Sequence, residues 1–284
     1  RVLAAYDARA EDMARAISTE MGAPIDWARQ QQVTAGSWHI EGFIAAARDM
    51  DWDRPLGAHA PGERILHDPI GVAALITPWN WPMNQVTLKV APALVAGCTM
   101  VLKPSEIAPL SGLLFAEIMD AAGLPPGVFN LINGDGAGVG SQLSAHPDVD
   151  IVSFTGSTRA GRLISIAAAD TIKRVSLELG GKGANIIFAD ADKKAVKRGA
   201  MRCFNNSGQS CNAPTRMLVS RDRYEEAVGI AAKLAEETPV IPASETGRGI
   251  GPVVSEVQFD KIQALIQTGI DEGARLAAGG TGRP

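Results

Sequence analysis

Short apolar runs of strand length alternate with helix-like segments from about residue 70 onward. Strands that alternate with helices need crossover connections, which place the strands parallel in one sheet and cover both faces of that sheet with helices. The alternation therefore predicts an α/β fold, a doubly wound parallel sheet of the Rossmann-like kind. The expected strands are 72–76, 99–102, 128–132, 151–154 and 174–177.

Two stretches of the sequence indicate domain boundaries. Residues 51–69 are rich in proline, glycine and charge, which predicts a hairpin excursion, and the pair Gly180-Gly181 precedes a second alternation of strands and helices. We predict a first domain over 1–50 and 70–180 and a second α/β domain over 181–284. The N-terminus opens directly into a helical pattern and the C-terminus ends in loop-like residues, so we expect an internal fragment of a longer protein. The second alternation comprises strands near 184–188 and 216–219 and helices from about 192, 223 and 256.

Composition excludes several classes of function. The net charge is −4 over 284 residues, with basic and acidic residues intermixed, which argues against nucleic acid or a membrane surface as partner. Apolar stretches are too short for a membrane span. Three cysteines make no disulfide framework and suit a reducing compartment, so we expect a cytoplasmic protein. The four histidines show no ligand spacing, and no metal site is expected.

One cysteine differs from the others in its setting. Cys211 follows the polar segment 204–210, which contains Gly208, and precedes Pro214. A thiol in such a loop can expose its sulfur and collect backbone N–H groups, as a nucleophile requires. Cys98 and Cys203 are interpreted as packing residues.

Polar residues follow the expected strands, where open α/β sheets bind their ligands. Asn80, on a stiff turn, offers an amide that can stabilise an oxyanion, although turn capping is an alternative. Glu178 precedes Gly180-Gly181 and can act as a general base. Lys103 and Glu106 can bind the two hydroxyls of a ribose, or form only a solvated pair.

Two glycine clusters are weak signals by themselves. The segment from Gly156 to Gly161 opens a helix directly after a strand, so Ser157 and the first free N–H groups can hold a phosphate. Neither this segment nor Gly134-x-Gly136 matches a phosphate-binding fingerprint, and both can be simple turns.

Five motifs, in this order, together resemble the NAD(P)-dependent aldehyde dehydrogenase superfamily. They are Thr77-Pro78-Trp79-Asn80-Trp81-Pro82, Lys103-Pro104-Ser105-Glu106, Phe154-Thr155-Gly156-Ser157, Glu178-Leu179-Gly180-Gly181-Lys182 and Gly208-Gln209-Ser210-Cys211. The resemblance covers essentially the whole chain. A Glu-x-Phe-Gly-Pro segment that family members carry beyond the cysteine is not in this sequence.

The resemblance implies an enzyme that oxidises an aldehyde to a carboxylic acid, with Cys211 as nucleophile, Glu178 as general base and Asn80 as oxyanion donor. It implies NAD as cofactor, with NADP as a second possibility, a first domain that binds it, and a homo-oligomer, dimer or tetramer, in which the 51–69 hairpin takes part. The implied cofactor contacts are Thr77, Pro78, Trp79, Lys103, Ser105, Glu106, Gly136, Gly156, Ser157 and Leu179.

Two alternatives stay open at this point. One is a catalytically silent fragment that binds cofactor or takes part in assembly. The other is a cysteine hydrolase or acyltransferase that uses no nicotinamide, which leaves Lys103, Glu106 and the Gly156 segment without a role. The sequence does not indicate which aldehyde is the substrate.

Overall fold

The computed structural model describes residues 1–283, which group into two compact units. Unit 1 comprises Arg1–Ile17 and Arg29–Leu179; unit 2 comprises Ser18–Ala28 and the residues from Gly180 on. The sequence assigned 1–50 as a whole to the first domain, whereas in the structure the short segment Ser18–Ala28 packs with the later residues. The roles predicted for the two domains stay predictions.

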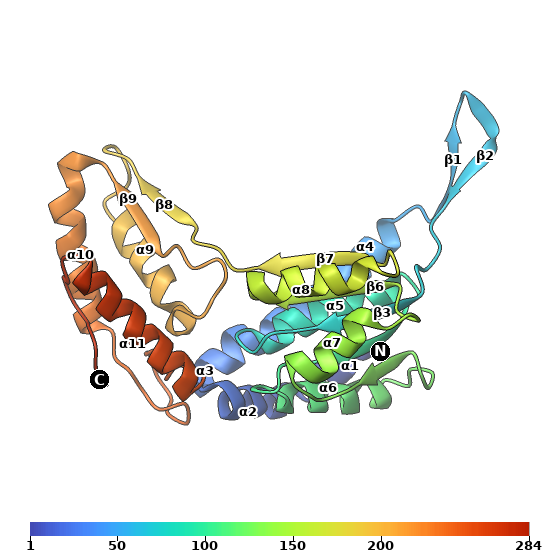
Figure 1. The fold of residues 1–284 in the computed structure, drawn as a ribbon, viewed down its shortest axis with the longest axis horizontal. Helices are drawn as coiled ribbons and strands as arrows, with labels where there is room; N and C mark the ends of the chain where they lie inside the picture. Colours follow the sequence, from blue (N-terminus) through green and yellow to red (C-terminus); the bar gives the residue numbers. More distant parts are fainter. Residues whose placement is uncertain (284) are drawn as a thin grey trace. The chain divides into compact units, whose positions relative to one another are not determined.

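Unit 1 is built on a five-stranded parallel sheet with strand order β5-β4-β3-β6-β7. Figure 1 labels its strands β3, β6 and β7. The chain starts at β3, adds β4 and β5 on one side, and then adds β6 and β7 on the other, which is a doubly wound topology and confirms the predicted fold class. The strands are β3 (Val72–Ile76), β4 (Thr99–Lys103), β5 (Phe129–Leu131), β6 (Ile151–Gly156) and β7 (Arg174–Leu179).

Helices cover both faces of this sheet. Because the winding direction reverses after β5, right-handed crossovers place α5 (Pro82–Val95) and α6 (Leu110–Ala121) on one face and α7 (Ser141–Ala145) and α8 (Thr158–Ala169) on the other. On the α7/α8 face, alternate residues of β3 and β6 form an apolar core with Ile164 of α8. The buried members of this core are Ala74, Ile76, Val149, Val152, Phe154 and Ile164.

The N-terminal helices are α1 (Val2–Ala8), α2 (Ala10–Met21), α3 (Ile25–Trp27), the π-helix η1 (Ala28–Val33) and α4 (Thr34–Asp49). Within unit 1, α4 packs on α5 and α1 packs on α6. Tyr6 is fully buried, its ring meets Phe115 edge to face at 6.2 Å, and its hydroxyl donates to the Val33 carbonyl at 3.0 Å. A Cβ at Gly36 would lie 2.3 Å from that hydroxyl, so the close packing of α4 on α1 requires glycine there.

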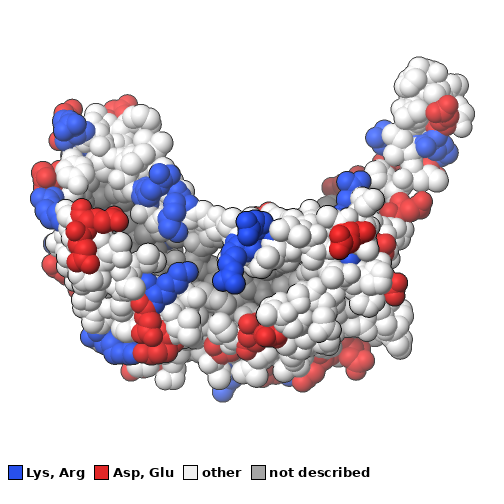
Figure 2. All heavy atoms as spheres, viewed as in Figure 1, with Lys and Arg blue, Asp and Glu red and all other residues white. Residues whose placement is uncertain are grey.

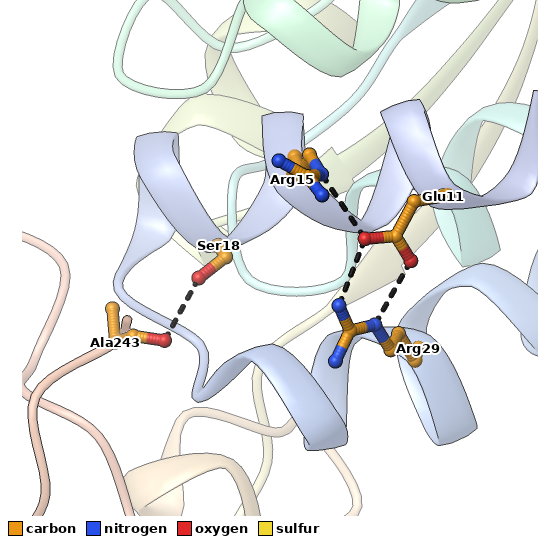
Figure 3. Close-up of polar contacts among 5 residues, drawn as sticks. All are labelled: Glu11, Arg15, Ser18, Arg29 and Ala243. Atoms are coloured by element: carbon orange, nitrogen blue, oxygen red, sulfur yellow. Dashed lines mark hydrogen bonds and ion pairs between the residues drawn. The ribbon is translucent and has the colours of Figure 1, made fainter. Parts of the chain in front are cut away.

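The chain leaves unit 1 after Ile17, within α2, and returns at Arg29. Figure 3 shows polar contacts near these two points, one set within unit 1 and one within unit 2. In unit 1, the Glu11 carboxylate accepts hydrogen bonds from Arg29 and Arg15, and the Arg29 bonds in particular lower the pKa of Glu11 to about 2. In unit 2, the Ser18 hydroxyl donates to the Ala243 carbonyl at 3.1 Å. Hydrogen bonds therefore hold the chain at both ends of the segment Ser18–Ala28.

Residues 53–66 form an antiparallel hairpin of β1 (Asp53–Gly57) and β2 (Ala60–Leu66), as the composition of 51–69 predicted (Figure 1). Its residues are exposed or half-buried, and in the ribbon it extends away from the sheet of unit 1. The hairpin thus contributes nothing to the core of this unit.

Unit 2 carries the second α/β alternation. Strands β8 (Ala184–Ile187) and β9 (Arg216–Val219) pair in parallel. Ile187 of β8 packs with Val196 of α9 and Ala227 of α10 in a small apolar core. The helices are α9 (Ala195–Phe204), the 3₁₀ turns η3 (Asn205–Gly208) and η4 (Arg221–Arg223), α10 (Tyr224–Glu237) and α11 (Glu256–Asp271).

Figure 2 shows acidic and basic side chains on the visible surface of each unit and on the hairpin. Arg64 of the hairpin forms an ion pair with Asp53. Among the described residues, no helix combines the length and apolar character needed to cross a membrane.

Candidate active site

The strand ends of unit 1 hold the predicted cofactor residues. The sheet reverses its winding between β3 and β6, and ligands of such sheets bind beyond the carboxyl ends of strands at this switch point. Thr77, Pro78 and Trp79 follow β3, whereas Gly156 ends β6 and Ser157 follows it. The topology therefore brings these two groups of predicted residues to neighbouring strands.

Asn80 lies between β3 and α5, in a segment whose backbone is fixed. The Thr77 N–H donates to the Lys103 carbonyl at 3.1 Å, and the Asn80 carbonyl accepts from the Gln32 side chain at 3.2 Å. Pro82 begins α5 and restricts the backbone directly after Asn80. The half-buried Asn80 is thereby held at one position relative to the strand ends.

Lys103 is buried at the end of β4, with only 2% of its side chain exposed. Its ammonium group donates to the Pro104 carbonyl at 2.9 Å and lies 3.3 Å from a carboxylate oxygen of Glu106, whose side chain is half exposed. The buried Ser105 hydroxyl accepts from the Ile107 N–H at 3.3 Å. The structure therefore brings the predicted Lys103–Glu106 pair together, with the carboxylate facing solvent.

Gly156 and Ser157, the predicted phosphate contacts, lie directly before α8. Ser157 caps the helix, because its hydroxyl accepts from the Ala160 N–H at 3.2 Å. A Cβ at Gly156 would lie 2.4 Å from the Phe154 ring, so any larger residue there would displace that ring. Gly136 begins the π-helix Gly136–Gly140, where the Asp135 carboxylate accepts from the Gly138 N–H at 2.7 Å, and a Cβ at Gly136 would meet nothing within 4 Å.

Glu178 and Leu179 are part of β7, two residues beyond the end that the sequence predicted for this strand. The strand extends because pairing with β6 continues from Thr155 opposite Glu178 to Gly156 opposite Leu179. Glu178 is exposed, and it points to the face of the sheet opposite the α7/α8 core, since alternate side chains of a strand point to opposite faces.

Sequence reasoning missed Lys89, a buried lysine of α5. Only 6% of Lys89 is exposed, and its ammonium group donates to the Ser153 hydroxyl at 2.9 Å. Burial lowers the pKa of Lys89 to about 8, while the negative charge of Glu178 acts in the opposite direction. A single lysine within the apolar sequence of Val86 to Val95 was the available signal, because a charged residue in a buried helix needs a specific partner.

Cys211 belongs to unit 2 and is the exposed cysteine of the three; Cys98 is buried and Cys203 is half-buried. It lies inside a turn closed by the Ala213 N–H, which donates to the Ser210 carbonyl at 3.1 Å. Burial raises the pKa of the Cys203 thiol, which disfavours its reactive thiolate form. Cys211 therefore has the accessibility that a nucleophile needs, and Cys203 does not.

Over residues 1–283, no group of three or more His, Cys, Asp and Glu side chains is arranged to hold a metal ion.

A comparison with protein families shows which family this chain belongs to. The sequence model of the "Aldehyde dehydrogenase family" matches residues 1–284. The chain belongs to the aldehyde dehydrogenase family. This membership confirms the resemblance drawn from the five motifs.

Curated and solved aldehyde dehydrogenases resemble the whole chain. A 3-succinoylsemialdehyde-pyridine dehydrogenase of a Pseudomonas species is 52% identical over 286 residues, which are 100% of this chain and 59% of the relative. The crystal structure of aldehyde dehydrogenase from Bartonella henselae is 64% identical, with a TM-score of 0.98, and the match covers 100% of this chain and 60% of that one. The chain thus spans about three fifths of these aldehyde dehydrogenases.

A further solved relative carries ligands. A cysteine-to-alanine mutant of aldehyde dehydrogenase C from Pseudomonas syringae, in complex with NAD+ and octanal, is 50% identical with a TM-score of 0.95. The match covers 100% of this chain and 58% of that aldehyde dehydrogenase.

Proposed function

We propose that the protein carrying this chain oxidises a small-molecule aldehyde to a carboxylic acid with NAD. The observation that carries the proposal is the accessible thiol of Cys211, in a chain that matches the aldehyde dehydrogenase family over its whole length. One relative is named for the semialdehyde of succinoylpyridine and another binds octanal in its crystal structure, so both aldehydes are substrates to test.

In the proposed reaction, the Cys211 thiolate attacks the aldehyde carbonyl and forms a hemithioacetal. The Asn80 amide and the Cys211 backbone N–H donate to its oxygen, which carries negative charge as the carbon–sulfur bond forms. The hydrogen bond at the Asn80 backbone carbonyl supports this role, because it limits how far the backbone that carries the amide must reorganise during the reaction.

Glu178 acts in the second half of the reaction. Oxidation of the hemithioacetal leaves a thioester on Cys211, and Glu178 takes a proton from the water that hydrolyses it. The carboxylic acid leaves and the thiol is restored. The exposed carboxylate of Glu178 supports this step, since water must reach both the base and the thioester.

The residues of unit 1 fit a nicotinamide dinucleotide. Bound NAD would supply the acceptor for the two electrons removed from the substrate. Ser157 and the N–H groups of α8 suit a pyrophosphate, and Lys103 with Glu106 suits the hydroxyls of a ribose. Gly156 is a further proposed contact beside Ser157. The remaining proposed contacts are Thr77, Pro78, Trp79, Ser105, Gly136 and Leu179.

The half-exposed carboxylate of Glu106 favours NAD over NADP, because it repels the 2′-phosphate of NADP. NADP is the second cofactor to test, since the hydroxyl of Ser105 lies beside this carboxylate in the sequence.

We also propose a homo-oligomer in the cytoplasm, without nucleic-acid or membrane partners. The β1–β2 hairpin supports assembly, because the residues of both strands are exposed or half-buried. Light scattering of the protein with and without residues 53–66 tests this; an unchanged mass would argue against a role of the hairpin.

The proposed chemistry is tested with Cys211→Ser and the matched control Cys203→Ser. We expect Cys211→Ser to abolish aldehyde-dependent NADH formation and to retain NAD binding, followed by quenching of tryptophan fluorescence; the control should retain both. Ester cleavage by the wild type that proceeds equally without NAD would favour a hydrolase. Absence of NAD binding would favour a silent assembly fragment.

A further inference from the structure

The turn that precedes Cys211 has an unusual backbone. Asn206 and Ser207 have φ angles of 54° and 56°, and Gly208 has a φ of 75°. Left-handed conformations are uncommon for residues other than glycine, and two such residues in succession need surrounding contacts to hold them.

Side chains of the turn close it on itself. The buried Asn206 side chain donates to the Gln209 carbonyl at 3.3 Å, and the Gln209 side chain donates back to the Asn206 carbonyl at 3.1 Å. The Gln209 backbone N–H also donates to the Asn206 carbonyl, at 3.0 Å. These reciprocal bonds fix the three residues between Phe204 and Gln209 whose backbone is left-handed.

Two further hydrogen bonds join the turn to a second loop of unit 2, residues 243–254. The Ser207 hydroxyl donates to the Gly251 carbonyl at 2.7 Å, and the Gln209 side-chain oxygen accepts from the Val254 N–H at 3.0 Å. The Gln209 side chain therefore bonds to two segments. Its amide nitrogen donates within the turn, and its oxygen accepts from Val254 of the second loop.

The second loop is held in turn by the segment Ser18–Ala28. The Ile25 N–H donates to the Ala243 carbonyl at 2.9 Å, and the Asp26 carboxylate accepts from the Gly247 N–H at 2.9 Å. A Cβ at Gly251 would lie 2.2 Å from the Gly22 carbonyl oxygen, so the two backbones touch. The turn before Cys211 is therefore held by the second loop, and the second loop is held by Ser18–Ala28.

We propose that Gln209 and Ser207 are positioning residues, which hold the strained turn so that Cys211 presents its thiol and backbone N–H in one orientation. The inference rests on the proposed role of Cys211 as nucleophile. Cys211 lies two residues after Gln209, and the Ser210–Ala213 turn that contains it begins at the next residue. A displacement of about 1 Å in such a group can reduce a rate by about a hundredfold.

The test compares Gln209→Met, which keeps the length of the side chain and removes both bonds, with the same change at the exposed Gln267 of α11. It also compares Ser207→Ala with Ser207→Gly. Both lack the hydroxyl, but glycine adopts the left-handed conformation without strain. The readouts are the alkylation rate of Cys211 by iodoacetamide, followed by fragment-ion mass spectrometry, and kcat and KM for NAD.

We expect Gln209→Met and Ser207→Ala to lower the alkylation rate of Cys211 and kcat about tenfold or more, with KM for NAD within about twofold of the wild type. Ser207→Gly and Gln267→Met should stay within about twofold of the wild type. Folding is checked by thermal unfolding, and the milder serine pair decides the result if Gln209→Met does not fold.

Unchanged alkylation in the folded variants would overturn the proposal, whether or not kcat falls. Equal losses in Ser207→Gly and Ser207→Ala would also overturn it, because strain would then play no part. If the variants change alkylation but the wild type oxidises no aldehyde with NAD, the positioning role stands and the proposed function fails.

Discussion

Lys89 of α5 donates a hydrogen bond to the Ser153 hydroxyl of β6 at 2.9 Å, inside unit 1. Burial lowers the pKa of Lys89 from 10.5 to about 8. Between these two pH values the unfolded chain binds a proton that the folded chain has released, so the free energy of unfolding rises with pH.

We expect the stability of the wild type relative to Lys89→Met to increase from pH 8 to pH 10.5, by up to ~3 kcal/mol. Chemical denaturation of both proteins across this range measures the difference. Lys233→Met, a change at an exposed lysine of α10, serves as the control and should show little pH dependence. A constant difference between wild type and Lys89→Met would mean that the ammonium group is solvated.

Glu178→Gln removes the proposed base of thioester hydrolysis and leaves Cys211 intact. We expect the first turnover to release a burst of NADH close to that of the wild type, followed by a steady-state rate lowered about 100-fold or more. Rapid-mixing absorbance measures both phases, with Glu117→Gln on α6 as a control. Loss of the burst together with the steady-state rate would assign Glu178 to the first half of the reaction instead.

Gly156→Ala places a methyl group 2.4 Å from the Phe154 ring, inside the α7/α8 core. We expect it to lower the free energy of unfolding by about 1–3 kcal/mol and to weaken NAD binding. The control is Gly42→Ala in α4, where nothing lies within 4 Å and alanine favours the helix by about 0.5–1 kcal/mol. Thermal unfolding and fluorescence titration report the two effects; equal stability of the two variants would contradict the packing argument.

Glu106→Ser removes the carboxylate that is proposed to repel NADP. We expect the ratio of kcat/KM with NADP to that with NAD to rise about tenfold, since roughly 1.4 kcal/mol of discrimination would be lost. The same replacement at the exposed Glu117 should leave the ratio unchanged. If Glu106→Ser also leaves it unchanged, the adenosine ribose does not lie against this carboxylate.

The strands of unit 1 could be predicted because buried parallel strands are short, nearly continuous apolar runs. Val72–Ile76 was predicted to the residue, and the later strands differed by one or two residues. The ends of β6 and β7 were predicted too early because Thr155 and Glu178 are polar. The two strands continue further because their backbones pair with each other, and the hydrophobic pattern of one strand does not reveal such pairing.

Three features depend on contacts far apart in the sequence and were not predictable from it. The hydrogen-bond partner of Lys89 is Ser153, which is 64 residues away. The left-handed backbone of Asn206 and Ser207 depends on residues 251–254. The departure of Ser18 from unit 1 depends on Ala243, whereas the periodicity of α2 continues past it without a break.

The chain passes between the two units three times, after Ile17, after Ala28 and after Leu179. Unit 2 therefore cannot be expressed from one contiguous gene segment. A clone that starts at Gly180 lacks residues 18–28, which contact the loop of residues 243–254. A protease that cuts only at Gly180-Gly181 would likewise not release the whole of unit 2, because residues 18–28 stay covalently attached to unit 1 at both ends. Neither unit can therefore be exchanged in evolution as one contiguous gene segment.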